Sequence, residues 1–584
     1  MILQALTAYY QTLADRGEIA APGWGAVKVT HALTLGDGGE VLGVVSLETQ
    51  GKGNKPVPRT FQAGQPGEKP LPKEVRKTSG IASNFLYGNS TYILGMDDKG
   101  KPERTMNCFQ ACRALHEQVL EGVETPAAKV LLRFFRTWQP EQAAQHPVLQ
   151  EHMEGLLKGG NLIFTYQGTF VHNDPEIRQA WERHYNQDGG DGPQMVCLVT
   201  GERGAVECVH PAIKNVRGAQ SSGAALVSFN APAFCSYGKE QNFNAPTGKF
   251  AAFAYTTALN HLLQDRDHVN YIGDTTVVCW AKGGGSAYQS LFSGVLFDRN
   301  YTEVDLLSMV NRLCRGECVE FEQSRLDPNM EFYVLGLSPN AARISVRFFL
   351  QNTFGGFLAN AQAHQKRLEM VRPVYERGER LSLWRILDET VSRKVKDRTP
   401  AHNLAGAMIR SVLTNTPYPA SILQALTIRI RADHTVNWPR AAMIKAYYAK
   451  HPHFEVPEEV LTVSINYESK NPAYRLGRLF AILERIQEEA NRNIKIKATI
   501  TDRYFSSASA TPAYVFPQLL RLAQKHLSKM EGGLENYHKE RLCEVMDGLE
   551  GYPKHLSLPQ QGDFQLGYYH QTQAQYQKQN KEEK

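Results

Sequence analysis

The stretch VKVTHALTLGDGGEVLGVVSL, residues 27–47, carries the clearest sign of secondary structure in the sequence. Two runs rich in Val, Leu and Thr, residues 27–35 and 40–47, flank the turn Gly36-Asp37-Gly38-Gly39. β-branched and aliphatic residues on both sides of a glycine-rich turn are typical of a β-hairpin. We therefore expect a sheet close to the start of the chain.

Helical and strand patterns alternate beyond this hairpin. Residues 2–13 carry apolar side chains at the three-four spacing of an amphipathic helix. Further helices are expected over 107–121, 126–138 and 250–263, and further strands over 161–166, 275–280 and 331–337. From residue 357 onwards helical patterns dominate. This succession predicts an α+β fold, with a mixed N-terminal region followed by an all-α C-terminal bundle.

The patterns divide the chain into three regions. We expect an N-terminal α+β recognition region over 1–355, a basic helical connecting region over 356–455 and a helical bundle over 456–584. The bundle should end in a polar tail from about residue 571. This tail is rich in Gln and Lys and poor in apolar residues, so we expect it to be disordered.

Length and composition narrow the class of protein. A chain of 584 residues, with 42% hydrophobic and 21% charged residues, is expected to form several globular domains. It has no apolar run long enough to span a bilayer and no signal peptide at its start, so we expect a cytoplasmic protein without a membrane partner. Nine cysteines, an odd number, favour reduced thiols and agree with that location.

Positive charge is concentrated in the middle of the chain. Residues 340–450 contain 18 Lys and Arg against 7 Asp and Glu, a net charge of +11, whereas the whole chain carries only +6. An arginine-rich stretch of this kind favours contact with phosphate groups, although a solvated helical surface would have the same composition. The candidate phosphate contacts in it are Arg393, Lys394, Lys396 and Arg398.

A second basic segment covers residues 51–80, with seven Lys and Arg against two Asp and Glu. Five prolines and five glycines are expected to prevent regular structure there, so the segment reads as a long exposed loop. Such a loop is either a linker or a binding arm. As a binding arm it would contact duplex phosphates through Lys73, Arg76 and Lys77.

Residues 230–244 combine amide, aromatic and basic side chains in a loop marked by glycine and proline. Asn and Gln can read base edges, Tyr can stack, and Lys can meet a phosphate or a base acceptor. The alternative is a buried polar loop whose side-chain amides form hydrogen bonds with the backbone of the loop itself. The candidates for base contact here are Tyr237, Lys239, Gln241 and Asn242, and residues 83–89 have a similar composition that adds Asn84 and Asn89.

Three arginines recur every seven residues in the expected helix over 473–492. Arg478, Arg485 and Arg492 therefore lie nearly on one line of that helix, apart from its apolar stripe. They are candidates for contact with a nucleic-acid backbone. The alternative is a solvated helix face on which nearby glutamates neutralise the arginines.

The sequence has no motif for catalysis. A phosphate-binding loop of the G-x-x-x-x-G-K-[ST] type, an H-E-x-x-H zinc motif and a G-x-S-x-G elbow are all missing. Two C-x₃-C pairs, Cys108 with Cys112 and Cys314 with Cys318, have ligand-like spacing but read better as small buried residues on helices. We expect no catalytic residue, metal or cofactor, and the enzymatic alternative is a metal-dependent nuclease that uses Asp267, His268 and Asp274.

Several long stretches, in the same order, resemble one known family. They are the start at Met1, Asn84-Phe-Leu-Tyr-Gly-Asn89, Phe229-Asn-Ala-Pro-Ala-Phe-Cys-Ser-Tyr-Gly238, Ile272-Gly-Asp-Thr-Thr-Val-Val-Cys-Trp280, Tyr474-Arg-Leu-Gly-Arg-Leu-Phe-Ala-Ile-Leu-Glu484 and Gln561-Gly-Asp-Phe-Gln-Leu-Gly-Tyr-Tyr-His570. With these the chain resembles the large subunit of the type I-C CRISPR effector complex (Cascade) over essentially its whole length. The resemblance implies a non-catalytic subunit that reads the short flanking motif, the PAM, in double-stranded DNA, while guide RNA reads the rest of the target.

The resemblance also implies the partners of such a subunit. They are CRISPR RNA, the target duplex, the Cascade backbone and CRISPR RNA-processing subunits, a small subunit, and the helicase-nuclease that degrades the target. In this family the small subunit is made from an internal start, for which Met443 or a codon nearer Pro457 is a candidate. The subunit would also promote duplex opening and stabilise the displaced strand of the R-loop. A structural scaffold that binds only guide RNA and neighbouring subunits is the competing interpretation.

Overall fold

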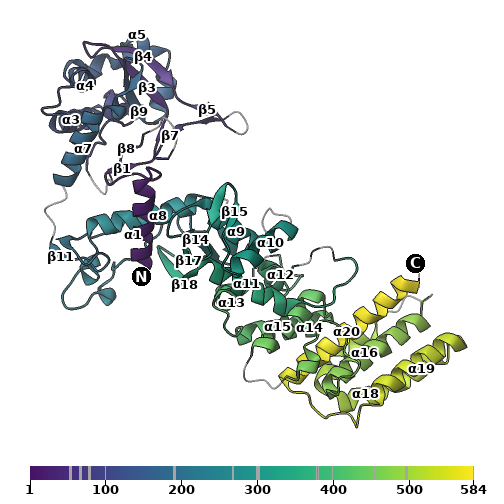
Figure 1. Ribbon diagram of the computed structural model, residues 1–584. Coiled ribbons are helices and arrows are strands. Elements are labelled where there is room, and N and C mark those ends of the chain that lie inside the picture. Colours follow the sequence, from purple (N-terminus) through teal and green to yellow (C-terminus); the bar gives the residue numbers. More distant parts are fainter. Residues whose placement is uncertain are drawn as a thin grey trace. The chain divides into compact units, whose positions relative to one another are not determined.

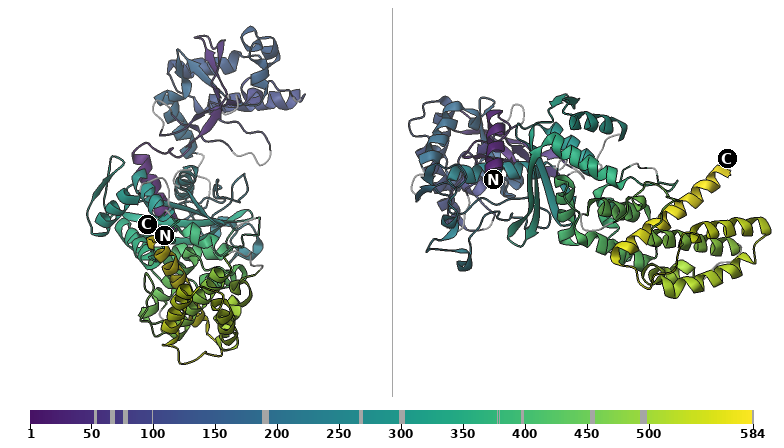
Figure 2. Two further views of the ribbon diagram at one scale, coloured as in Figure 1. Left: turned by 90° about the vertical axis from the view of Figure 1, so that its right-hand side faces the viewer. Right: turned by 60° about the horizontal axis from the view of Figure 1, so that its bottom comes forward.

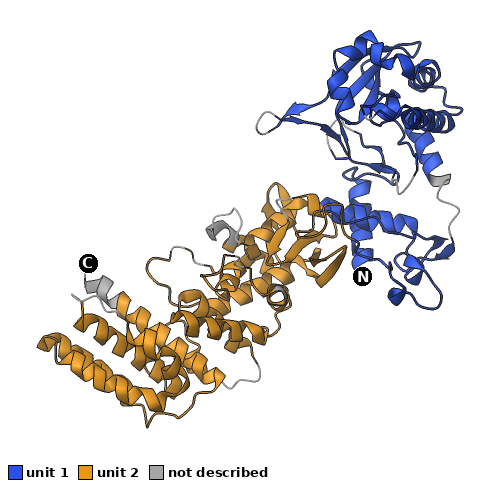
Figure 3. Cartoon of the chain, turned by 180° about the vertical axis from the view of Figure 1, so that it is seen from behind, with its two compact units in different colours: residues 1–214, 225–261 blue, residues 215–224, 262–584 orange. Residues whose placement is uncertain are grey.

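The structure, a computed structural model (Figure 1), describes residues 1–51, 55–64, 69–75, 80–98, 100–187, 193–265, 269–297, 303–376, 378, 380–396, 399–451, 456–492 and 498–582. It divides into two compact units (Figure 3). Unit 1 consists of residues 1–214 and 225–261, and unit 2 of residues 215–224 and 262–584. Both region borders predicted from the sequence, at 355 and 455, fall inside unit 2.

The predicted hairpin forms one side of a four-stranded sheet in unit 1, with β4 at the edge. Strand β3 (His31–Leu35) pairs antiparallel with β4 (Val41–Ser46) and parallel with β9 (Leu162–Tyr166), and β10 (Thr169–Phe170) completes the order β10-β9-β3-β4. Gly39 has φ +86°, and a Cβ atom there would lie 2.5 Å from the backbone nitrogen of Phe134. Only glycine fits this close approach of the turn to a helix.

Two long helices form most of the core beside this sheet. In α4 (Pro126–Thr137), Thr125 caps the first turn by accepting the backbone N–H of Ala128, and one face of the helix is buried. Phe134 on that face lies 5.5 Å, between ring centroids, from Phe164 of β9. Helix α3 (Pro102–Val119) joins the same hydrophobic cluster. The sheet and these helices therefore bury one common core, as the α+β prediction requires.

Further helices and strands complete unit 1. They are α1 (Ile2–Asp15), β1 (Trp24–Gly25), β2 (Val27–Val29), β5 (Thr49–Gln50), β6 (Pro56–Val57), β7 (Arg59–Phe61), β8 (Leu71–Pro72), α2 (Ser90–Ile93), α5 (Pro147–Gln150), α6 (Met153–Leu157), α7 (Pro175–Gln187), β11 (Gln194–Val196), β12 (Arg203–Ala205) and α8 (Lys249–Gln264), which crosses into unit 2.

The basic segment over 51–80 differs from the expected long loop. Strands β6, β7 and β8 pair with β5, β2 and β1, and the side chains of Phe61 and Leu71 are buried. The prediction that prolines prevent regular structure here was therefore wrong. Each pairing is only two or three residues long, and a two-stranded ribbon tolerates proline because only one side of each strand needs hydrogen-bond donors.

Unit 2 is built on an antiparallel sheet in the order β13-β14-β17-β18. Its strands are β13 (Asn270–Ile272), β14 (Thr275–Ala281), β17 (Glu331–Asn340) and β18 (Arg343–Thr353), and β15 (Val319–Phe321) pairs separately with β16 (Ser324–Leu326). All seven residues of β14 are buried, so the apolar run Thr275–Ala281 is a central strand.

Helices make up the rest of unit 2. They are α9 (Ser286–Phe297), α10 (Glu303–Cys314), α11 (Phe354–Leu368), α12 (Leu383–Asp388), α13 (His402–Thr414), α14 (Ala420–Asp433), α15 (Trp438–Lys450), α16 (Pro472–Ala490), α17 (Ile500–Ala510), α18 (Pro512–Leu527), α19 (Gly532–Met546) and α20 (Leu558–Glu582). One hydrophobic cluster extends from the sheet to α20. The predicted connecting region and bundle thus share a core with the sheet. No helix in the described part of the chain is both long and apolar enough to cross a bilayer.

The expected disordered tail is instead the second half of α20, which packs along α16 (Figures 1 and 2). Gln571 and Gln573 are buried, and Gln571 accepts a hydrogen bond from Arg478 of α16 at 3.1 Å. The prediction from composition was wrong at this point. Composition counts Gln571 as a residue suited to solvent, whereas in the fold its side chain is buried and hydrogen-bonded to Arg478.

A carboxyl group buried between α16 and α20 predicts a pH effect on stability. Asp563 is 4% exposed, accepts a hydrogen bond from Asn471 at 3.0 Å, and has its pKa raised by burial from 3.8 to about 6. The folded chain therefore holds this proton more tightly than the unfolded chain, and native stability falls as the pH rises from about 4 to about 6.

We expect Asp563→Asn to stabilise unit 2 by about 1–3 kcal/mol at neutral pH, since one pKa unit corresponds to about 1.4 kcal/mol. The gain should disappear below about pH 4, where the native carboxyl is neutral. Urea denaturation across this pH range, with hydrogen exchange on α16 and α20 to assign the transition, measures it. Glu540→Gln, at an exposed position of α19, is the matched control. A gain that does not depend on pH would contradict the argument.

Candidate nucleic-acid interface

The polar loop over 230–244 in unit 1 is held in shape by one side chain, that of Asn244. Its Oδ1 accepts the backbone N–H of Ser236 at 2.8 Å. Its Nδ2 donates to the backbone oxygens of Lys239 and Gln241 at 3.0 and 2.9 Å. These three hydrogen bonds connect the two sides of the loop. The residues between Ser236 and Gln241 therefore form a tip with a defined backbone conformation.

Three of the predicted base-contact residues project from this tip. Tyr237 is 99% exposed, and Lys239 and Gln241 are also exposed. Tyr237 has φ +53° and Gln241 has φ +45°, both in the left-handed region that non-glycine residues rarely adopt. Such strain persists only where surrounding contacts impose it, and it is frequent at ligand-binding sites. In contact with a nucleic acid, the ring of Tyr237 can stack on a base, the ammonium of Lys239 can pair with a phosphate, and the amide of Gln241 can hydrogen-bond a base edge.

Asn242, the fourth candidate of this loop, is not accessible. It is 2% exposed, its backbone N–H donates to the oxygen of Cys208 at 3.4 Å, and its Oδ1 has no hydrogen-bond partner in the described part of the chain. We therefore remove Asn242 from the base-contact candidates. Asn244, which the composition of the loop includes, is the residue that organises it.

The side chains of Asn84 and Asn89 each accept a backbone hydrogen bond from a nearby residue. Asn84 is half-buried and accepts the backbone N–H of Val75 at 2.9 Å. Asn89 caps α2 by accepting the backbone N–H of Tyr92 at 3.4 Å. Each side chain thus uses its oxygen within its own segment, so neither is as free to read bases as the tip of the 230–244 loop.

The basic segment before Asn84 contacts the helix that follows the loop. The Lys73 ammonium lies 5.1 Å from the ring centroid of Phe253 on α8, and its backbone N–H donates to Gly23 at 2.7 Å. Arg76 and Lys77 lie outside the described residues. The segment that ends at Val75 is therefore tied to α8, which begins five residues after Asn244.

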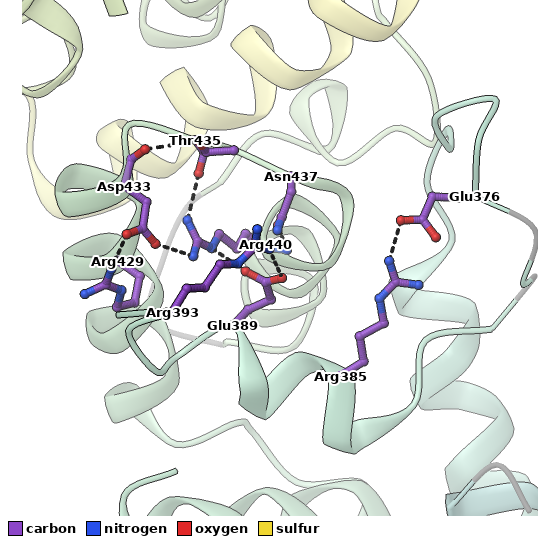
Figure 4. Close-up of polar contacts among 9 residues, drawn as sticks. All are labelled: Glu376, Arg385, Glu389, Arg393, Arg429, Asp433, Thr435, Asn437 and Arg440. Carbon is purple, nitrogen blue, oxygen red and sulfur yellow. Dashed lines mark hydrogen bonds and ion pairs between the residues drawn. The ribbon is translucent and has the colours of Figure 1, made fainter. Parts of the chain in front are cut away.

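In unit 2 the basic stretch is held by a network of ion pairs (Figure 4). The Nε of buried Arg440 lies 2.8 Å from Glu389 Oε2, and its Nη2 lies 2.6 Å from Asp433 Oδ2. Arg393 and Arg429 add further pairs to Glu389 and Asp433. Arg440, whose side chain is 2% exposed, is therefore an internal ion-pair partner and does not reach a ligand, which neither the phosphate-contact prediction nor the solvated-surface alternative foresaw.

The surface part of this stretch keeps its positive charge. The side chain of Arg393 is 66% exposed although its Nη2 lies 3.2 Å from Glu389, and Lys394 and Lys396 are exposed beside it. Arg398 lies outside the described residues. The predicted phosphate contact at Arg393, Lys394 and Lys396 remains available to a ligand and stays a prediction.

The arginine line on α16 is not a continuous binding surface. Arg478 is 1% exposed and is held by Glu544 at 2.9 Å, by Gln571 and by the ring of Tyr467. Arg485 is 17% exposed and pairs with Glu489 at 2.7 Å. Only Arg492, 62% exposed, reaches solvent. Spacing places the three residues on one line, but helices α19 and α20 cover its first part, so we withdraw Arg478 and Arg485 as backbone contacts.

The structure describes some of the residues that the nuclease and zinc alternatives would use. Asp274 pairs with Arg347 at 2.8 Å, whereas Asp267 and His268 lie outside the described residues. Cys108 and Cys112 lie on α3, buried and one turn apart. In the described ranges no three His, Cys, Asp or Glu side chains gather as a metal site would require.

The comparison with family models identifies a family for this chain. Residues 6–576 match the family described as CRISPR-associated protein (Csd1). A comparison with curated proteins finds no match. The match covers nearly the entire chain, including both units and the loop over 230–244.

Proposed function

The chain belongs to the Csd1 family of CRISPR-associated proteins, and from this premise we propose that it is the non-catalytic large subunit of a type I-C Cascade that reads the PAM in double-stranded DNA. Base pairing with guide RNA then reads the target. The observation that carries the proposal is the tip of the 230–244 loop, where Asn244 fixes the backbone and Tyr237, Lys239 and Gln241 project. A rigid tip of this kind suits entry into a groove.

Phosphate contacts would position the loop on the duplex. Lys73 near α8 is the candidate in unit 1, and Arg393, Lys394 and Lys396 are the candidates in unit 2 for the target or the displaced strand. Contacts of this type supply affinity without sequence information. In this role the subunit promotes duplex opening, stabilises the R-loop and recruits the helicase-nuclease, with guide RNA and the backbone subunits as its other partners.

The buried position of Met443 bears on the proposed small subunit. Met443 is fully buried in the middle of α15, so a start there would cut that helix after its first five residues. A start near Pro457 would leave α16 to α20 whole. We therefore favour the later start for a separately made bundle.

The test measures binding of labelled duplexes to the complex reconstituted with guide RNA, at fixed salt. We expect Tyr237→Ala and Gln241→Ala to weaken binding of PAM-bearing duplexes by about 5- to 150-fold and to leave duplexes without a PAM unchanged, as loss of a base contact does. Asn244→Ala should have a similar effect, because it releases the tip. Lys158→Ala, at an exposed lysine in the same unit, is the control.

Two other outcomes have different meanings. Equal weakening on all duplexes would mean that the loop contacts phosphates, and Lys239→Ala, which removes the ammonium of the loop, would then make the dependence of affinity on salt shallower. No effect of any loop variant would favour the structural scaffold, which binds only guide RNA and neighbouring subunits.

A further inference from the structure

A cavity of about 610 Å³ in unit 2 belongs to none of the surfaces described so far. Segments far apart in the sequence line it, namely the turn between α14 and α15, Glu484 of α16, the start of α17, residues 568–576 of α20 and the loop at 373–375. Figure 4 shows Asp433, Thr435 and Asn437 of that turn. The walls come from packed helices, so the cavity is part of the fold.

Five Tyr and Trp side chains contribute to the described lining of the cavity. Trp438 and Tyr569 are buried, whereas Tyr375 is 79% exposed and Tyr576 is 47% exposed. The ring of Tyr576 already lies 5.8 Å from the guanidinium of Arg485, which does not line the cavity. Tyr375 and Tyr576 thus line the cavity and are exposed to solvent, and the π-faces of aromatic rings attract cations.

The polar lining is acidic. Asp433, Glu484 and Asp502 contribute carboxyl groups, and the described lining contains no Lys or Arg. Arg440 and Arg429 already pair with Asp433, and Glu484 accepts hydrogen bonds from Tyr568 and Thr501. Asp502 is exposed, and hydrogen bonds from the backbone and hydroxyl of Thr499 lower its pKa. Asp502 is therefore ionised at neutral pH and accessible to a ligand.

We propose that this cavity binds an alkylammonium or guanidinium group between Tyr375 and Tyr576, with Asp502 as its counter-ion. A nucleotide fits the same volume less well, because its phosphate would find no Lys or Arg in the described lining, where His434 is the basic residue, and would be repelled by the carboxylates. The cation comes either from a free polyamine or from a Lys or Arg side chain of a partner protein. None of the proposed DNA contacts lines the cavity, although Asp433 of its lining belongs to the ion-pair network that also holds Arg393.

The test is calorimetric titration of the full-length protein, free of nucleic acid, with spermidine, with the amide of the tripeptide Gly-Arg-Gly, and with AMP. We expect one of the two cations to bind and AMP not to bind. Tyr375→Ala and Tyr576→Ala should each weaken cation binding about two- to fivefold, and the double variant about tenfold. Tyr514→Ala, at a tyrosine of α18 that is 70% exposed outside the cavity, should have no effect.

The titrations with spermidine and with the arginine peptide distinguish the two sources of the cation. Preference for spermidine identifies a polyamine site, and preference for the arginine peptide identifies a docking site for a protein side chain. The proposal is overturned when neither cation binds, when all variants including Tyr514→Ala behave alike, or when AMP binds and the cavity variants weaken it. Because both tyrosines are exposed, their removal is not expected to unfold unit 2.

Discussion

Arg440→Ala is expected to destabilise unit 2 by about 3–5 kcal/mol, because it leaves two carboxylates without their buried partner. The Arg440 side chain is 2% exposed and contacts Glu389 at 2.8 Å and Asp433 at 2.6 Å (Figure 4). Its Nη1 also donates to the backbone oxygen of Thr435 at 3.0 Å. Truncation removes all three contacts at once, and Glu389 itself is only 7% exposed.

Arg393→Ala is the matched control, because it removes a second arginine from the same Glu389. The Arg393 side chain is 66% exposed, so its ion pair is screened by solvent and its loss should cost less than about 1 kcal/mol. Urea denaturation, with hydrogen exchange on α12 and α15 to assign the transition, compares the two variants. Similar losses of stability would show that burial of Arg440 does not control the network. Arg393→Ala should weaken DNA binding instead.

Elements set by local sequence were predicted well. The hairpin over 31–46 and the buried strand Thr275–Ala281 formed as expected, because turn glycines and apolar runs act within a few residues, whereas residues 27–29 of the first predicted run pair with β7 instead. The short pairings of β6, β7 and β8 were missed, since each depends on a partner strand elsewhere in the chain. The helical second half of α20 was missed because its polar residues find partners on α16.

The same division applies to the candidate site. Composition of the 230–244 loop indicated which side chains have the right chemistry, and Tyr237, Lys239 and Gln241 are exposed. It gave no means of separating them from Asn242, which the fold buries, or of finding that Asn244 holds the tip. Burial is a tertiary property, and residue type alone does not report it.

The contact between α16 and α20 depends on one glycine in each helix that lies against the backbone of the other helix. A Cβ atom at Gly477 would lie 1.9 Å from the backbone oxygen of Phe564, and one at Gly567 would lie 2.0 Å from the backbone oxygen of Tyr474. Both obstacles are backbone atoms, which a side-chain rotation cannot remove. The two helices therefore approach each other as closely as backbones allow, and any larger residue must push them apart.

Gly477→Ala is consequently expected to destabilise unit 2 by about 3 kcal/mol or more, although alanine is the better helix former by about 1 kcal/mol. Gly533→Ala in α19 is the matched control, because a Cβ atom there meets nothing within 4 Å. It should stabilise the helix by about 0.5–1 kcal/mol. Hydrogen exchange of α16 and α20 and urea denaturation measure both variants. Opposite signs would establish that the close crossing outweighs helix propensity, whereas stabilisation by both would show that α16 and α20 can separate without loss.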